Sequence, residues 1–529
     1  MKPSISKLLS VAALFASLTS CKDGLLDFAG GYQYESSSEH GMIVLGEQLE
    51  DPYSLANMTK AFESLYPTKA GVVSLEATNN YVRLLPRDDE DFKALESLGV
   101  KMLDHPLDYQ ILVEGDYYHD PSIDDEEVTW QYAVVSPDFK APDGIRCELL
   151  HECYLAEPEQ SSKAGLDWVD WEAVERESFR LTGNEDMLEP LTKGKSEAKV
   201  PKGRICIIDS EYGDDPIGVS GVEVSCNVFV RFDRCFTDEE GYYQMRKSFS
   251  SKPRYRLVFT NSKGFSQGFN TIFIRGSISS FGKQPNTGYS TVITEKSEPT
   301  LFRRCVINNA AYDYYESCSS SGVKIKTPPA NLRIWSFGFL DGSAALMMHQ
   351  SAIISMDVVK SFVGEYYPVV SFFMPDIVIG AKNRNTYSDL YHVVQHELAH
   401  ASHYMMVGND YWNTYAMFIL DSYISSGKVL YGTGTEDNAG VCEVGEMWAY
   451  YIENLLYRER YPNWIKSFGD TYWFHPEIFL YLDRRGMDRF KIFPVLTKDV
   501  TSKEILRSRL ISFYPECRSM IDEAFNRYL

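Results

Sequence analysis

The chain has 529 residues, with 74 acidic and 52 basic side chains and a formal net charge of −22. Its hydrophobic fraction of 44% is that of a folded globular protein, and its length predicts several folded units. The acidic excess argues against nucleic acid as a partner, because binding to phosphates requires a basic surface. Beyond residue 21, no stretch approaches the roughly 20 apolar residues of a membrane-spanning helix, which excludes a polytopic membrane protein.

Residues 1–21 are predicted to be a lipoprotein signal peptide. Two lysines precede an apolar run from Leu8 to Leu18, which is the pattern of a secretory signal. The segment ends at Leu18-Thr19-Ser20-Cys21, which resembles the lipobox of bacterial lipoproteins. The resemblance implies lipid attachment at Cys21, and Lys22 in place of an aspartate favours a surface-exposed outer-membrane lipoprotein that is held to the membrane by its lipid. An ordinary cleaved signal peptide is the alternative.

Residues 22–191 are predicted to form an N-terminal α+β domain. Tyr81–Pro86 has the pattern of a strand, and Asp88–Leu98 has that of a helix with acidic residues in its first turn. No catalytic motif is found in this region. The polar stretch Thr192–Lys199 has no apolar period and is predicted to be a linker.

Residues 200–270 are predicted to form a small all-β sandwich, because short apolar runs alternate with turns. The opening run Arg204–Asp209, the strand Gly221–Val224 and an expected hairpin at Thr237–Tyr243 together resemble a carboxypeptidase regulatory-like domain. The resemblance extends over residues 202–268 and implies a spacer or scaffold, so no catalytic residue is assigned there.

Residues 285–529 are predicted to be mainly helical, with strands at Leu332–Phe337 and Asp376–Gly380. The segment Tyr391–His403 has a helical pattern, and Gly408 is placed to end the helix. On such a helix His396 and His400 are one turn apart and share a face, so both imidazoles can bind one zinc ion. Glu397 follows His396 at an angle of about 100° around the helix, beside the ligands, where it can deprotonate a water molecule.

The run His396-Glu397-x-x-His400 resembles the zincin metallopeptidases, and the resemblance implies a third zinc ligand. The metzincin branch requires a histidine where Met406 stands, so this branch is excluded. The gluzincin branch takes a glutamate from a later helix, and the predicted helix Cys442–Leu455 begins an "E-x-x-A-x-Y" run at Glu446. Glu446 is therefore the expected third ligand of one Zn²⁺ per chain, and Glu443 is the second choice.

Other residues remain open as contributors to the site. His403 is an alternative ligand, and His392 is expected to lie beside the ligands or at the surface. Candidates for stabilising an oxyanion are Tyr404, Tyr431, Tyr450 and His475, and Tyr450 is named as the catalytic candidate. Tyr450 stands four residues after Glu446, where the best-known gluzincins have an aspartate. The strand Asp376–Gly380 is expected either to be an edge strand that pairs with a peptide or to be a core strand.

These features together predict a multidomain α+β protein with a C-terminal zincin-like domain. The expected function is zinc-dependent hydrolysis of extracellular or periplasmic proteins or peptides, glycosylated ones included. The alternative is a surface lipoprotein that binds glycans or proteins and carries a structural or vestigial zinc site. A third reading keeps the zinc chemistry and directs it at a non-peptide bond. Three pairs of cysteines are close enough in sequence to be disulfide candidates: Cys147/Cys153, Cys226/Cys235 and Cys305/Cys318.

Overall fold

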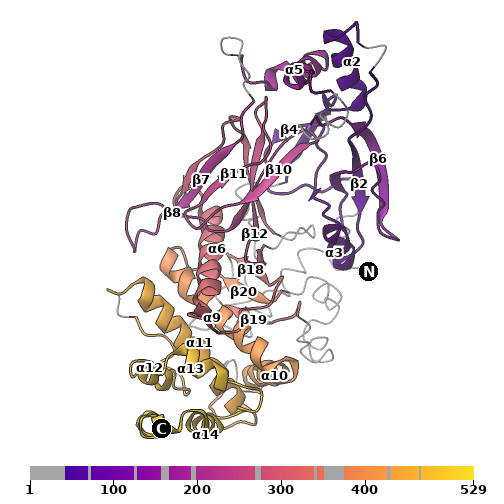
Figure 1. Cartoon of the computed structure of the whole chain (residues 1–529). Coiled ribbons are helices and arrows are strands. Elements are labelled where there is room, and N and C mark those ends of the chain that lie inside the picture. The colour runs from indigo at the N-terminus through magenta and orange to yellow at the C-terminus, as the bar shows by residue number, and fades with distance from the viewer. Residues whose placement is uncertain are drawn as a thin grey trace, which may run out of the picture.

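The computed structural model describes residues 42–69, 73–123, 128–156, 166–191, 198–268, 276–338, 342–350, 375–425, 431–463 and 466–528. The protein has a mixed α/β fold with several sheets and a helical C-terminal region. These parts follow one another along an elongated molecule (Figure 1). The predicted signal peptide with Cys21, and most of the predicted linker, lie outside the described residues. Within those ranges, no helix has both the length and the apolar character needed to cross a bilayer.

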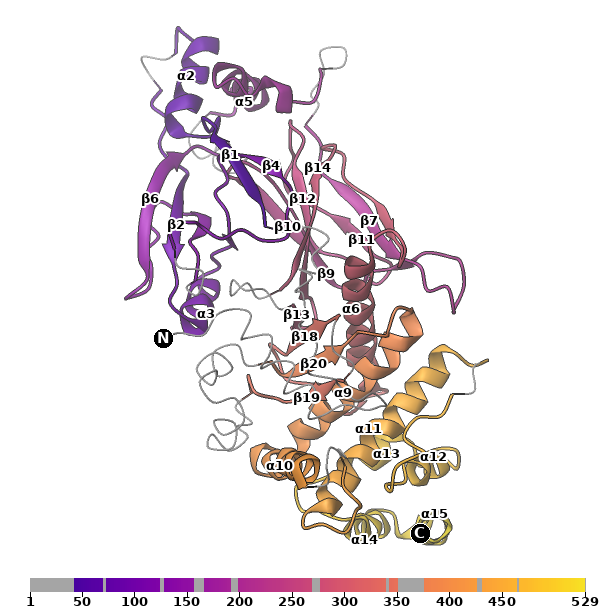
Figure 2. The same ribbon diagram turned by 180° about the vertical axis from the view of Figure 1, so that it is seen from behind.

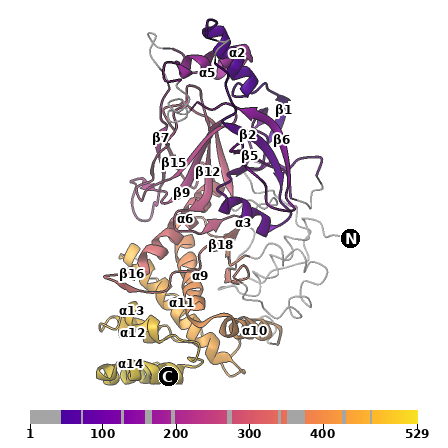
Figure 3. The same cartoon turned by 45° about the vertical axis from the view of Figure 1, so that its right-hand side comes forward.

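The N-terminal unit consists of two small antiparallel sheets and the helices that flank them. The larger sheet has the strand order β3-β5-β2-β6, and β1 pairs with β4. Figure 3 labels β5, β2 and β6 of the larger sheet. The strand predicted at Tyr81–Pro86 overlaps β2, which ends at Leu85, and the helix predicted at Asp88–Leu98 is α3 with its two capping residues. The elements are β1 (Val44–Gln48), α2 (Leu55–Leu65), β2 (Asn79–Leu85), α3 (Asp89–Ser97), β3 (Met102–Leu103), β4 (Tyr109–Val113), β5 (Gln131–Val135), β6 (Arg146–Cys153) and α5 (Trp171–Leu181).

The central part of the molecule packs two sheets face to face. One sheet contains β11, β7, β15 and β8, and the other contains β10, β9, β12 and β14. Buried side chains of both sheets, among them Ile205, Val224 and Leu257, belong to one hydrophobic core. The strands are β7 (Lys202–Ile207), β8 (Ile217–Gly218), β9 (Val222–Val228), β10 (Arg231–Phe236), β11 (Tyr242–Gln244), β12 (Arg254–Asn261), β13 (Ser266–Gln267), β14 (Ile278–Lys283) and β15 (Thr291–Ile293).

The expected hairpin at Thr237–Tyr243 is wrong in one respect. The turn is present, with the backbone N–H of Tyr242 donating to the Asp238 carboxylate at 2.7 Å and Gly241 at a φ of +81°. However, β10 pairs with β9 whereas β11 pairs with β7. The turn therefore passes the chain from one sheet to the other instead of joining two paired strands.

The sheet of β12 continues directly into the C-terminal region. β13 pairs with β12 and, in parallel, with β18 (Arg333–Phe337); β18 pairs in parallel with β20 (Ile377–Gly380). β19 (Ala344–Ala345) pairs with β20 in the antiparallel direction and lies at the edge (Figure 2). Of the two alternatives for Asp376–Gly380, the core strand is therefore favoured over the edge strand, because β18 pairs along one side and β19 pairs with Ile377 and Val378 on the other.

The helical region surrounds α9 and α11, which pack against each other. Trp448 of α11 donates its indole N–H to the backbone carbonyl of Ala399 in α9 at 3.0 Å. The helices are α6 (Pro299–Ser317), α9 (Tyr387–Val407), α10 (Asn409–Ser425), α11 (Ala439–Arg460), α12 (Glu477–Asp483), α13 (Arg489–Ile492), α14 (Lys503–Phe513) and α15 (Arg518–Arg527).

None of the suggested cysteine pairs forms a disulfide in the described part of the chain. For the first pair the reason is geometric. Cys147 and Cys153 both lie on β6, and six residues of an extended strand separate their Cα atoms by roughly 20 Å, far beyond the reach of a disulfide.

Candidate metal centre

Helix α9 presents the two histidines of the motif on one buried face. The helix begins after Thr386, whose hydroxyl accepts from the backbone N–H of Asp389 at 3.2 Å, and it ends at Gly408, which has a φ of +79°. The whole predicted segment Tyr391–His403 therefore lies inside one continuous helix. The Nε2 atoms of His396 and His400 are 3.2 Å apart, so the two imidazoles converge on the same point.

Helix α11 brings Glu446 to the same point. One carboxylate oxygen of Glu446 lies 3.5 Å from His396 Nε2, and the other lies 3.5 Å from His400 Nε2. All three side chains are buried, with Glu446 only 1% exposed. The structure thus brings together the three predicted ligands, which come from two helices and are separated by about fifty residues of sequence.

The arrangement fits a tetrahedral metal ion. Ligand atoms about 2.0–2.2 Å from zinc are separated from one another by about 3.4 Å. The two imidazole nitrogens are 3.2 Å apart, and each lies 3.5 Å from a different oxygen of the Glu446 carboxylate. Burial raises the pKa of Glu446 to about 7, although His396 and hydrogen bonds from Tyr415 and Tyr431 act in the opposite direction, so a cation would offset a burial cost that remains. Burial holds the pKa of His400 well below its ordinary value, so this imidazole is neutral, as a zinc ligand must be.

Glu397 lies next to the three ligand residues and is also buried, at 3% exposure. Burial raises the pKa of Glu397 to about 8, and the neighbouring Glu446 and Glu453 carboxylates act in the same direction. A carboxylate with an elevated pKa is suited to take up and return a proton near neutral pH. Glu397 is therefore a buried, titratable neighbour of the candidate ligands.

Glu453 holds the first histidine in place. Its two carboxylate oxygens contact His392 Nδ1 at 2.6 Å and His396 Nδ1 at 2.9 Å. Burial would raise the pKa of Glu453, but the hydrogen bonds to both histidines lower it below its ordinary value. An ionised Glu453 accepts the Nδ1 proton of His396 and leaves Nε2 free for a metal, which is the usual role of a carboxylate behind a histidine ligand.

Tyrosines surround the ligands, but not all of the predicted ones are at the site. Tyr450 lies against His396, with ring centroids 4.5 Å apart, so it is a neighbour of the ligands. The Tyr404 hydroxyl contacts the Gln350 carbonyl and Asn409, and the half-buried His475 faces Glu477.

Tyr415 and Glu453 are functional neighbours that the sequence analysis did not assign. Tyr415, on α10, donates its hydroxyl hydrogen to Glu446 Oε1. Glu453 had a detectable signal, because it follows Glu446 by seven residues and therefore lies two turns along the same helix face. Tyr415 had no such signal, since no spacing relates α10 to either ligand helix.

Two alternative ligands do not join the cluster. His403 is fully buried beside Tyr411 and Trp412, and neither of its ring nitrogens has a hydrogen-bond partner in the ranges described above. Glu443 instead pairs with Lys503 of α14 at 2.8 Å. Neither residue belongs to the group formed by the two motif histidines and Glu446.

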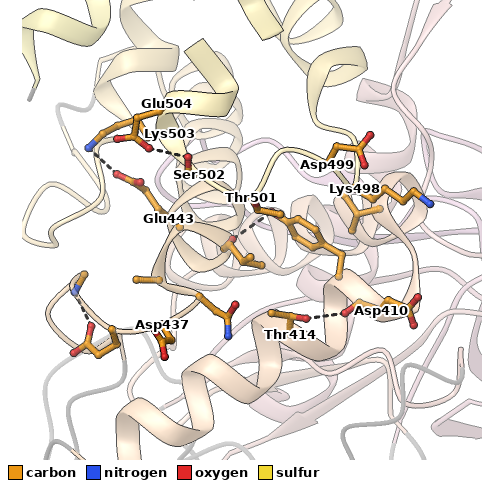
Figure 4. Close-up of a pocket in the computed structure, with 18 of the residues that line it drawn as sticks. Asp410, Thr414, Asp437, Glu443, Lys498, Asp499, Thr501, Ser502, Lys503 and Glu504 are labelled. Carbon is orange, nitrogen blue, oxygen red and sulfur yellow. Dashed lines mark hydrogen bonds and ion pairs between the residues drawn. The ribbon is translucent and has the colours of Figure 1, made fainter. Parts of the chain in front are cut away.

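Glu443 lines a separate cavity of about 1310 Å³ where α10, α11 and α14 begin. Figure 4 shows the Glu443 carboxylate directed at Lys503, and Ser502 bound to Glu504 on the same wall. None of the three ligand residues lines this cavity. Glu443, the second choice for the third ligand, therefore lines this separate polar cavity and not the candidate metal site.

Comparisons of this chain with models of known protein families, with curated proteins and with solved structures give no match. The geometry of the site and the sequence motif are therefore the grounds on which a function can be argued.

Proposed function

We propose that this chain is a zinc-dependent peptidase of the gluzincin type. The observation that carries the proposal is the convergence of His396 Nε2, His400 Nε2 and the Glu446 carboxylate at mutual distances of 3.2–3.5 Å. Three protein ligands that leave a fourth position for water are typical of catalytic zinc sites, whereas structural sites are closed by four. Zinc held there would polarise the scissile carbonyl and lower the pKa of water to about 7.

The protein's own groups then have distinct tasks in the proposed reaction. Glu397 takes a proton from water and returns it to the leaving amine. Glu453 fixes the tautomer and the orientation of His396, and Tyr415 holds Glu446 in place. Tyr450, whose ring lies against His396, is the proposed oxyanion donor.

The proposal includes the setting in which the enzyme works. The lipobox-like run that ends at Cys21 supports a location on the bacterial outer membrane, with attachment through lipid. Its substrates would be extracellular or periplasmic proteins or peptides, glycosylated ones included. The sandwich that resembles a carboxypeptidase regulatory-like domain would act as a spacer.

The test combines metal analysis with an unbiased digest. Purified protein is assayed for bound metal and incubated with a peptide library, with and without a chelator. We expect about one zinc ion per chain at this site and cleavage that the chelator abolishes. The variant Glu397→Gln should retain zinc and lose cleavage by several orders of magnitude, because it keeps the ligands and lacks the base. Parental cleavage rates in Glu397→Gln would remove Glu397 from the mechanism.

The choice between the two glutamates of α11 is tested separately. Glu446→Gln should weaken zinc retention strongly, because it removes a charged ligand, whereas Glu443→Gln should leave zinc bound and affect only the contact with Lys503. Both variants are dialysed against a graded series of chelator concentrations, and bound zinc is measured. Greater loss in Glu443→Gln would assign the ligand role to Glu443.

The alternative function is a glycan- or protein-binding lipoprotein with a structural zinc site. It requires a fourth protein ligand, and His403 is the nearest histidine in sequence. His403 lies outside the ligand cluster, against aromatic rings, which favours the peptidase. A folded protein that binds zinc but cleaves no member of the library, and no ester or other non-peptide substrate, would support the binding role.

A further inference from the structure

A second group of metal-ligand side chains lies in the N-terminal unit, remote from the helical region. Asp51, His151 and Cys153 each offer a ligand atom, and these three atoms lie within 4.8 Å of one another. We propose that these three residues bind a second transition-metal ion, with zinc as the expected metal. The site shares no residue with the proposed peptidase site, so either proposal can be correct without the other.

The backbone around the three residues is fixed before any metal binds. Asp51 begins the turn that leads into α2, and its Oδ1 accepts the backbone N–H of Tyr53 at 2.8 Å. The same turn is tied to the end of β6, because Tyr154 N–H donates to the Tyr53 carbonyl at 2.9 Å. His151 and Cys153 are two residues apart on β6 and therefore point to the same face of the strand. Little ordering is required for the three side chains to act together.

The distances require only a small adjustment to admit an ion. His151 Nε2 lies 2.8 Å from Asp51 Oδ2. Nitrogen and oxygen ligands of tetrahedral zinc are about 3.4 Å apart, so these two atoms would separate by about 0.6 Å, and the Cys153 sulfur lies within 4.8 Å of both. The Cys153 thiol is fully buried, whereas the His151 side chain is 26% exposed, which leaves a route from solvent on one side.

The electrostatic environment favours a cation. Asp51 is buried, and a second buried carboxylate, Asp108, acts on Asp51, His151 and Cys153. Both oxygens of Asp108 are already bound, one to the Tyr81 hydroxyl at 3.3 Å and the other to the Gln48 amide at 2.7 Å. Asp108 therefore adds negative charge without competing for the ion.

The ligand types indicate the class of metal. A thiolate, an imidazole and a carboxylate together are soft-to-borderline ligands, which favour zinc over calcium or magnesium. Binding of the ion would release the thiol proton to solvent as the sulfur–metal bond forms.

The test uses cobalt(II) as a spectroscopic substitute for zinc in the full chain. A cobalt–thiolate bond gives a charge-transfer band in the near ultraviolet, whereas a site of two histidines and a glutamate contains no sulfur and gives none. We expect the parent to bind two equivalents of cobalt and to show this band. Zinc added in excess should remove the band.

Variants assign the band to the residues. Cys153→Ser should lose the band and reduce the stoichiometry from two to one, whereas Cys147→Ser, at the exposed start of the same strand, should retain both. The double variant His396→Ala/His400→Ala should keep the band while losing the other equivalent. Asp51→Asn, which keeps the size of the side chain, should weaken cobalt binding at least tenfold.

The proposal is overturned if the folded parent shows no cobalt–thiolate band. It is equally overturned if a band persists in folded Cys153→Ser. Because the first of these results needs no variant, a Cys153→Ser protein that fails to fold leaves the proposal testable. Loss of the peptidase activity has no bearing on either outcome, since the two sites share no residue.

Discussion

At the scale of single residues, Glu453 differs most from what the resemblance to gluzincins implies. The best-known members place an aspartate four residues after the glutamate ligand, and here that position is Tyr450. Glu453, seven residues after Glu446, supplies the carboxylate behind His396 instead. It also binds His392, so one buried side chain aligns a ligand and a second histidine.

Replacing Glu453 by glutamine should weaken zinc binding 10- to 100-fold, because the amide is uncharged and cannot accept from both histidines in the same way. Competition with a chromophoric chelator measures the affinity. Glu459→Gln, which alters an exposed carboxylate of the same helix, is the matched control and should leave zinc affinity unchanged. Equal affinities for the parent and Glu453→Gln would assign Glu453 a purely structural role.

At the scale of elements, the close approach of α10 and α11 depends on Gly445. A Cβ atom at Gly445 would lie 3.3 Å from the Tyr415 ring, and Tyr415 is the residue that holds Glu446. The absence of a side chain at this position therefore lets Tyr415 of the neighbouring helix support the proposed metal ligand Glu446.

We expect Gly445→Ala to be nearly neutral for stability and Gly445→Val to be destabilising by about 1–3 kcal/mol. Alanine gains up to about 1 kcal/mol in helix propensity, which offsets the tight contact, whereas valine must displace the Tyr415 ring. Thermal unfolding and zinc retention are measured together for both variants. If Gly445→Val retained parental stability and zinc, the contact with Tyr415 would have no part in holding the ligand.

Features that depend on local sequence could be predicted, whereas features that depend on contacts between distant segments could not. The motif helix, its end at Gly408 and the helix that carries Glu446 follow from local periodicity and capping, and all are present. The interior position of β20 and the contact between Tyr415 and Glu446 depend on which segments pair across long distances, and no spacing encodes that. Glu453 lies between these cases. Its position on the same face of α11 as Glu446 can be seen in the sequence, but its contacts with His392 and His396 cannot.

At the scale of the whole molecule, a buried polar chain joins the N-terminal unit to the sandwich. Asp104 contacts His105 Nδ1 at 2.9 Å, and His105 Nε2 accepts from Arg256 of β12 at 2.8 Å. Arg304 of α6 adds a contact with Asp116 at 3.1 Å. The N-terminal unit is therefore attached by specific buried hydrogen bonds and ion pairs.

This connection predicts a pH dependence of stability. Burial and the adjacent Arg256 lower the pKa of His105 to about 4, against an ordinary value of 6.5. Between these values the unfolded chain binds a proton that the folded chain does not, so the free energy of unfolding falls as the pH falls. The loss begins as the pH falls through about 7, near the pKa of the unfolded chain, and reaches up to about 3 kcal/mol by pH 4.

Urea unfolding of the parent and of His105→Gln at pH 7 and pH 4.5 isolates this contribution. Glutamine keeps a neutral hydrogen-bonding side chain but does not titrate, so the variant should lose about 2 kcal/mol less than the parent on acidification. Parallel losses in the two proteins would show that other groups account for the acid sensitivity.

The continuous sheet from β12 through β13 to β18 has a consequence for any cleaved form of the protein. A fragment released by a cut near residue 285 would carry β18 without β13, and the exposed side of β18 would present unpaired backbone donors and acceptors. Such an edge is a template for self-association. Proteolysis at this boundary would therefore give a helical fragment with a new open edge at Arg333 and Ile334, the two residues of β18 that pair with β13.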